Sequence, residues 1–195
     1  MPQREITSSD LMDIAAYTAI RKAKRQEMVA IKKDRRVPVG PDATFYFESY
    51  ETMLYQVHEM LAIEKGGEAQ IPDELAAYNP LIPQGRELVA TIMFEIDDPV
   101  RRATVLGRLG GVEDCMYLEV GGERASGRAE EDVDRTAADG KASSVQFVHF
   151  EMTDSQVVAM NAVGARIIVG VDHVNYAHMA VMPEATRISL ASDLD

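Results

Sequence analysis

The order of apolar and polar residues predicts helices and strands that follow one another irregularly. Apolar residues at helical spacing predict helices over residues 7–33 (with a break), 50–63, 98–109 and 153–163, and weaker patterns mark 73–78 and 184–190. Runs of strand-forming residues predict strands over 43–48, 88–96, 115–120, 123–129, 144–152, 166–171 and 177–182. Without strict strand–helix–strand alternation, this order favours an α+β fold. We expect a mainly antiparallel sheet of six or seven strands packed with four or five helices.

Several local signals set the boundaries of these elements. Thr7 and Asp10 have the spacing of a capping box, and Thr153 and Gln156 have it again. Two glycines, Gly121 and Gly122, separate two short strand-like runs and therefore predict a hairpin. The run 37–41 contains two prolines and ends the first helix, because proline lacks a backbone donor and has a fixed φ.

The chain has the length and composition of one globular domain. It contains 195 residues, of which 46% are hydrophobic, and this is enough to form a core without disulfides or metal. The acidic, small-residue-rich stretch 130–140 is typical of an exposed loop, and no segment resembles a linker between domains. We therefore expect a single domain spanning residues 1–195.

Charge is distributed unevenly along this acidic chain. The formal net charge is −12, yet residues 1–36 alone carry +4 and the remaining residues carry −16. The overall charge argues against general binding to nucleic acid or to an anionic membrane. The basic helical segment could pack on the acidic body, or it could contact an acidic partner, a phosphorylated ligand or RNA. No aromatic residues are interleaved with the basic ones for base stacking, which disfavours RNA.

The end of this basic segment supplies the candidate residues for a protein partner. They are Lys32, Lys33, Arg35 and Arg36.

Targeting signals and common catalytic motifs are missing from the sequence. The first ten residues lack the apolar core of a signal peptide, and no apolar run is long enough to span a bilayer, so we expect a cytoplasmic protein without membrane contact. One cysteine rules out an intrachain disulfide. His58-Glu59 begins like a zinc-protease motif, but Ala62 stands where the second histidine is required. The sequence therefore names no reaction and leaves open whether the protein is an enzyme.

Three predicted strands end in the same Phe-Glu pair. The pairs are Phe47-Glu48, Phe94-Glu95 and Phe150-Glu151. Because side chains alternate across a strand, phenylalanines that face the core place their glutamates on the opposite face. That face could be solvated, or the glutamates could meet in one site that holds a divalent metal such as Fe, Mn or Zn, or a small ligand. The candidate residues for this metal or ligand site are Glu48, Glu59, Glu95, Glu151 and His173.

A set of short motifs also resembles one bacterial protein family, the domain of unknown function 3501 (DUF3501) family. The motifs lie at 4–6, 35–37, 47–48, 56–61, 78–83, 112–114 and 170–173, which is nearly the full length of the chain. The resemblance maps the family's motif residues onto Glu48, Gln56, Glu59, Tyr78, Asn79 and His173. It also implies a redox or peroxide-defence context, since members are often encoded near rubrerythrin-like diiron proteins and iron–sulfur oxidoreductases.

Two hypotheses of different class follow from these observations. The first is a non-catalytic accessory or interaction protein whose partner belongs to a bacterial redox system. The second is a metal- or small-ligand-binding domain, which could be an enzyme and would use the glutamates and His173 named above. The sequence leaves the oligomeric state open.

Overall fold

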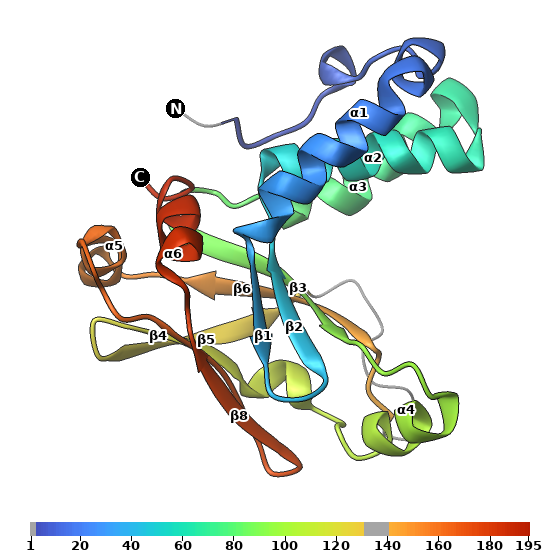
Figure 1. Cartoon of the computed structure of the whole chain (residues 1–195). Helices are drawn as coiled ribbons and strands as arrows, with labels where there is room; N and C mark the ends of the chain where they lie inside the picture. Colours follow the sequence, from blue (N-terminus) through green and yellow to red (C-terminus); the bar gives the residue numbers. More distant parts are fainter. Residues whose placement is uncertain (1–2, 131–140) are drawn as a thin grey trace.

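Eight strands form one antiparallel sheet in the computed structural model, which describes residues 3–130 and 141–195 (Figure 1). The strand order is β1-β2-β3-β6-β5-β4-β7-β8, and all neighbouring strands are antiparallel. The strands are β1 (Arg36–Val39), β2 (Ala43–Phe47), β3 (Glu87–Phe94), β4 (Met116–Val120), β5 (Glu123–Ala129), β6 (Val145–Glu151), β7 (Ile168–His173) and β8 (Tyr176–Val181). The predicted loop 130–140 lies outside the described residues except for Glu130.

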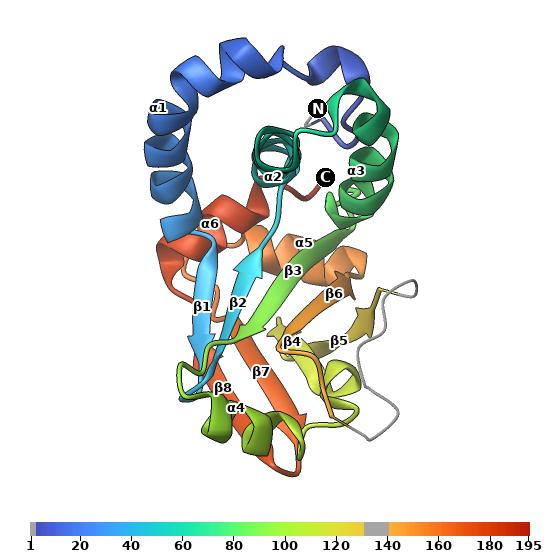
Figure 2. The ribbon, with the colours of Figure 1, turned by 90° about the vertical axis from the view of Figure 1, so that its right-hand side faces the viewer.

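Six α-helices surround the sheet in the described part of the chain. They are α1 (Ile14–Lys33), α2 (Tyr50–Glu64), α3 (Ile71–Tyr78), α4 (Pro99–Leu106), α5 (Asp154–Asn161) and α6 (Glu184–Ala191). Figure 2 shows α1, α2 and α3 together at one end of the sheet and α4 at the other end. The predicted capping boxes are present before the 3-10 turn Ser8–Asp10 and before α5. The expected break also occurs, because α1 begins only after its own cap, Asp13.

The sheet curves into a nearly closed barrel, and Tyr176 at the start of β8 joins its two ends. The Tyr176 hydroxyl donates a hydrogen bond to the Val39 carbonyl at 2.8 Å. It accepts bonds from the amides of Asp42 and Ala43 at 2.9 and 2.8 Å. Gly40 in the β1–β2 turn has a φ of +71°, and a Cβ there would approach Tyr176 and His178 to within 2.8 Å. Glycine is therefore required where the two edges of the sheet meet.

Two apolar layers lie on opposite faces of the sheet. The barrel interior is filled by inward residues of all strands, including Phe45, Phe47 and Phe150, whose ring centroids lie 6.3–6.5 Å apart. The outer face of β3 and β6 packs against α2 and the segment after α3 through a smaller cluster that includes Val89 and Val57. The phenylalanines of the Phe-Glu pairs therefore face the barrel interior, as the alternation predicted.

The predicted α+β class with an antiparallel sheet is confirmed, but the predicted element counts are too low. The missed strand is β1, whose sequence contains Pro38 and follows a helix directly. Proline is tolerated there because β1 is the first strand of the sheet order and pairs on one side only. Both weakly marked helices exist as α3 and α6. No helix in the described residues is long and apolar enough to cross a membrane.

Candidate ligand-binding site

A cavity of about 370 Å³ lies between the outer face of the sheet and the helices that cover it. Strand alternation places its floor, because residues 46 and 48 of the β2 region and residues 91 and 93 of β3 point to the same outer face. The roof comes from α2, the end of α3 and the end of α1. The lining residues are Lys32, Tyr46, Glu48, Met53, Gln56, Tyr78, Leu81, Thr91, Met93, Val145 and Phe147. We call this space the Glu48 cavity.

Glu48 is the buried charged group of this cavity. It is only 5% exposed and directly precedes Ser49, the N-cap of α2. Its two carboxylate oxygens accept hydrogen bonds from the hydroxyl groups of Thr52 at 2.6 Å and Thr91 at 2.7 Å. Among the residues that the structure describes, no cation forms an ion pair with it. Because a carboxylate offers about four acceptor positions, Glu48 can still accept hydrogen bonds from a ligand.

Gln56 and Tyr78 form the polar part of the opposite wall. Both side chains line the cavity. Burial raises the pKa of the Tyr78 hydroxyl above its usual range, although the nearby Gln56 side chain opposes the shift. Glu48, Gln56 and Tyr78, three of the residues that the family resemblance suggested, thus line one cavity although they come from three separate segments.

Glu59, another candidate residue, connects α2 to α1. It accepts a hydrogen bond from the Tyr17 hydroxyl at 2.7 Å and a two-point contact from Arg21, with both N–O distances at 2.9 Å. The contact with Arg21 holds the pKa of Glu59 below its usual range. Its carboxylate is therefore occupied in holding the two helices together.

Glu95 and Glu151 lie on the same outer face as Glu48 but not beside it. Glu95 follows the end of β3 that is distant from Glu48, and it accepts hydrogen bonds from Thr44 at 2.8 Å and Tyr46 at 2.7 Å. Glu48 lies beside Val89 of β3, and Glu95 follows six residues later along that strand direction, which corresponds to a backbone separation of about 20 Å. Glu151 is exposed and lies 3.5 Å from Arg128. Antiparallel pairing separates Glu95 from Glu48, because it sends the ends of β2 and β3 to opposite ends of the sheet. Glu151 ends β6 at the same end of the sheet as Glu48, but on the far side of β3, opposite Glu87.

His173 lies at the β7–β8 hairpin, where its Nδ1 accepts a hydrogen bond from the Asn175 amide at 3.2 Å. This hairpin adjoins the β1–β2 turn, at the end of β2 opposite to Glu48. Over residues 3–130 and 141–195 there is no group of three or more His, Cys, Asp or Glu that could hold a metal ion. The five candidate residues therefore do not converge, and the metal-binding hypothesis gains no support.

The four basic candidate residues also differ in their surroundings. Lys33 and Arg36 are exposed, and Lys32 is half-buried with its ammonium 5.9 Å from the centroid of the Tyr55 ring. Arg35 is buried, where it donates hydrogen bonds to the carbonyls of Phe47 and Glu48 and forms an ion pair with Asp193. Arg35 is therefore occupied inside the fold and unavailable to a partner.

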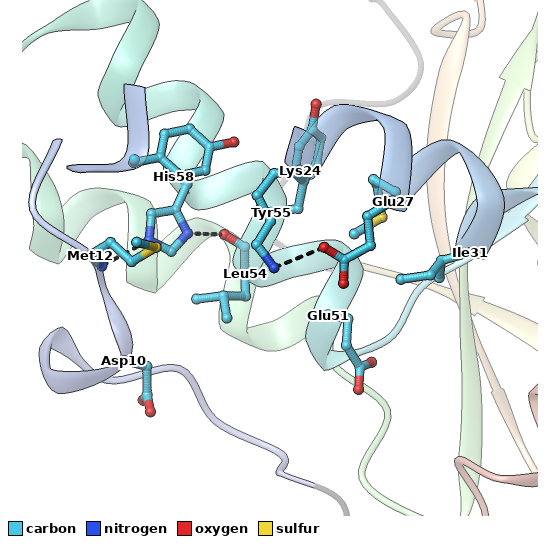
Figure 3. Close-up of a pocket in the computed structure, with 11 residues that line it drawn as sticks. Asp10, Met12, Lys24, Glu27, Ile31, Glu51, Leu54, Tyr55 and His58 are labelled. Carbon is cyan, nitrogen blue, oxygen red and sulfur yellow. Dashed lines mark hydrogen bonds and ion pairs between the residues drawn. The ribbon is translucent and has the colours of Figure 1, made fainter. Parts of the chain in front are cut away.

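A second cavity, of about 260 Å³, lies between α1 and α2 and is shown in Figure 3. His58 is the imidazole in its wall, and both ring nitrogens are bonded. Nδ1 donates to the Leu54 carbonyl at 2.8 Å, and Nε2 accepts from the Met12 amide at 2.9 Å. Burial lowers the pKa of His58, so the ring is neutral and attaches the N-terminal segment to α2. It offers no free nitrogen for a metal.

A third arrangement of ionisable groups surrounds His149 on β6. Its Nδ1 lies 2.9 Å from Glu87 and its Nε2 lies 2.7 Å from Glu130. Burial alone would lower the pKa of His149, but the hydrogen bonds to the two carboxylates outweigh this effect and raise it. The ring therefore donates from both nitrogens as an imidazolium. Only the strand register, which pairs β6 with β3 on one side and with β5 on the other, brings these groups together.

Sequence reasoning missed several groups of the Glu48 cavity, namely Tyr46, Thr52 and Thr91. Tyr46 could have been found, because it lies two residues before Glu48 on the same strand face. Thr52 could have been found as well, since it lies at the third position after the helix cap Ser49. Thr91 could not, because its position beside Glu48 depends on the pairing of β2 with β3.

Comparisons with known proteins match nearly the whole chain. A family model described as "Protein of unknown function (DUF3501)" matches residues 5–194. A crystal structure of a novel protein of unknown function from Burkholderia pseudomallei is 37% identical in sequence. The alignment covers 97% of this chain and 99% of that chain, with a TM-score of 0.90. No curated protein matches the chain.

Proposed function

This chain belongs to the DUF3501 family, as its motifs predicted, and we propose that it is a binding protein for a small polar molecule held in the Glu48 cavity. The observation that carries this proposal is the buried carboxylate of Glu48. It lines a cavity of about 370 Å³ and accepts bonds from two hydroxyl groups while no cation pairs with it in the described residues.

The free-energy cost of burying the Glu48 carboxylate supports the presence of a ligand. Burying a charge without a counter-charge is unfavourable, and a polar ligand that donates to Glu48 would reduce that cost. The cavity volume is in the range of small-molecule sites, and its walls combine a few polar groups with apolar ones such as Met53 and Phe147. Gln56 can both donate and accept, which suits a ligand with hydroxyl or amino groups.

Fragment screening with a matched pair of variants tests this proposal. The probes are small polyols, amines, amino acids and organic phosphates, observed by saturation-transfer NMR with the wild-type protein. Glu48→Gln keeps the shape but removes the charge, and Glu151→Gln is the control, since Glu151 is exposed on the same face of the sheet.

We expect at least one probe class to bind wild type and the Glu151→Gln variant equally, and to bind the Glu48→Gln variant at least tenfold more weakly. Probes that bind all three proteins alike, or no binding at all, would contradict the proposal. Thermal unfolding of each variant checks that the fold is retained.

A second candidate function is that of an accessory protein for a bacterial redox system, and the exposed cations at the end of α1 favour it. Lys33 and Arg36 form no ion pair among the described residues and are accessible to an acidic protein surface. The redox context itself rests on the family resemblance alone.

Surface plasmon resonance with purified rubrerythrin-like and iron–sulfur proteins tests this function. Binding that weakens with salt and with the double change Lys33→Gln and Arg36→Gln is expected. Absence of binding to both proteins at low salt would exclude this version.

A further inference from the structure

A short groove lined by four cations adjoins the Glu48 cavity. It has a volume of about 250 Å³ and contains Arg25, Lys32, Lys33 and Arg36 beside the rings of Tyr46 and Tyr55. No carboxylate is among the groups that line it. We call it the basic groove.

The cations of the basic groove gather because of helix geometry. Residues 25, 32 and 33 of α1 are seven and eight positions apart and therefore share one helix face, and residue 36 begins β1 directly afterwards. None of the four forms an ion pair with another residue in the described ranges 3–130 and 141–195. Four cations without a paired carboxylate create a positive potential in the groove, which attracts an anion.

The basic groove and the Glu48 cavity are neighbours, since Lys32 and Tyr46 line both. The Tyr46 hydroxyl donates to Glu95 at 2.7 Å, which fixes the ring between the two spaces. Figure 2 shows that the end of α1 runs into β1, which lies beside β2. A ligand that spans these two neighbouring spaces would contact cations at one end and the Glu48 carboxylate at the other.

We propose that the ligand is a phosphorylated small molecule whose phosphate binds in the basic groove and whose hydroxyl or amino group donates to Glu48. This inference rests on the proposed function and adds the chemical class of the ligand. Arginine and lysine side chains together suit phosphate, which carries nearly two negative charges and several acceptor oxygens.

The geometry favours a small molecule over a polymer. The groove adjoins a cavity that contains a buried carboxylate, and this charge would repel the next phosphate of a nucleic acid. The net charge of −12 opposes a long polyanion as well. No aromatic residue lies among the basic residues in the sequence, but β2 and α2 bring the rings of Tyr46 and Tyr55 to the groove. These rings offer apolar contact to the carbon skeleton of the ligand.

Isothermal titration with three probes at equal ionic strength tests the inference: glycerol 3-phosphate, inorganic phosphate and glycerol. The first variant carries Lys33→Gln and Arg36→Gln. Its control carries Lys22→Gln and Arg108→Gln, which removes the same charge from exposed positions outside the groove. The third variant is Glu48→Gln.

We expect glycerol 3-phosphate to bind wild type and the control alike, and to bind the groove variant at least tenfold more weakly. Wild type should prefer glycerol 3-phosphate to inorganic phosphate, and the Glu48→Gln variant should lose that preference. No saturable binding of either phosphate, or equal weakening by the control, would overturn the phosphate site.

Two further outcomes separate this inference from the proposed function. If the fragments that depend on Glu48 are neutral and bind the groove variant as tightly as wild type, the cavity function stands and the phosphate class is wrong. If phosphate binding is weakened by the groove variant but not by Glu48→Gln, the anion site stands and the cavity function is wrong. A poly-glutamate peptide that binds the groove more tightly than glycerol 3-phosphate would overturn the small-molecule inference in favour of an acidic protein partner.

Discussion

The guanidinium group of Arg35 donates a hydrogen bond from Nη2 to the backbone carbonyl of Glu48 at 2.8 Å. Its Nε donates to the Phe47 carbonyl at 3.0 Å, and the Phe47 amide in turn donates to the Arg35 carbonyl at 2.8 Å. The junction between α1 and β1 is thereby joined to the end of β2. Arg35 thus fixes the backbone of Glu48, whose side chain lines the cavity. The sequence had suggested this buried arginine as a contact for a protein partner.

Replacing Arg35 should therefore destabilise the fold far more than replacing its neighbour. Arg35→Ala leaves the buried carboxylate of Asp193 without its ion-pair partner and removes two hydrogen bonds to backbone carbonyls. We therefore expect the unfolding free energy to fall by about 3 kcal/mol. Arg36→Ala, at an exposed position, should change stability by less than about 0.5 kcal/mol. Urea denaturation measures both. Similar values for the two variants would show that the Arg35 contacts are unimportant.

Glu59→Gln should loosen the contact between α1 and α2. The change removes the charge that the Tyr17 hydroxyl and Arg21 share, and we expect a loss of about 1–3 kcal/mol in urea denaturation. Because the pKa of Glu59 is lowered in the folded protein, this contribution is present above the unfolded pKa and is lost as the pH falls through the folded one. Glu27→Gln, which breaks only the exposed pair with Lys24, is the control and should have little effect.

His149 should make stability depend on pH on the alkaline side. Its pKa is raised in the fold, so its contribution is complete below the unfolded value of about 6.5 and is lost as the pH rises through the folded value. The difference in unfolding free energy between wild type and His149→Gln should therefore shrink as the pH is raised above neutrality. Glu130→Gln removes one of the two acceptors and should weaken the dependence. A difference that stays level with pH would mean that the imidazolium is absent.

His58 should make the stability of the fold depend on pH on the acidic side. Its pKa is lowered by burial, so the unfolded chain takes up the proton first and the folded state loses stability as the pH falls below about 6.5. Protonation of Nε2 removes the acceptor of the Met12 amide, which should free the segment before α1. The protection of that amide against hydrogen exchange, relative to its intrinsic exchange rate and followed by NMR, should decrease towards acid pH in wild type. In His58→Gln the pH dependence beyond that of intrinsic exchange should disappear, and its persistence would argue against this role.

Much of the fold could be predicted from local patterns. The capping boxes at Thr7 and Thr153 and the hairpin at Gly121-Gly122 depend on neighbours within a few residues, and the structure contains them all. The strand β1 could not be predicted, because Pro38 opposes a strand locally and is accepted only at the edge of the sheet. The closure of the barrel through Tyr176 depends on contacts between residues more than 130 positions apart.

The sequence by itself determined which residues face which side of the sheet, the division of charge between residues 1–36 and the rest, and the family. Period-two alternation and simple composition are sufficient for these, since both are local. Only the tertiary structure decided which glutamate of the three Phe-Glu pairs is buried. Glu48 is covered by α2 and the end of α3, whereas Glu151 occupies an equivalent strand end that is left open to solvent. The packing of helices on the sheet creates that difference, and it also brings Lys32, Tyr46 and Gln56 to the cavity beside Glu48.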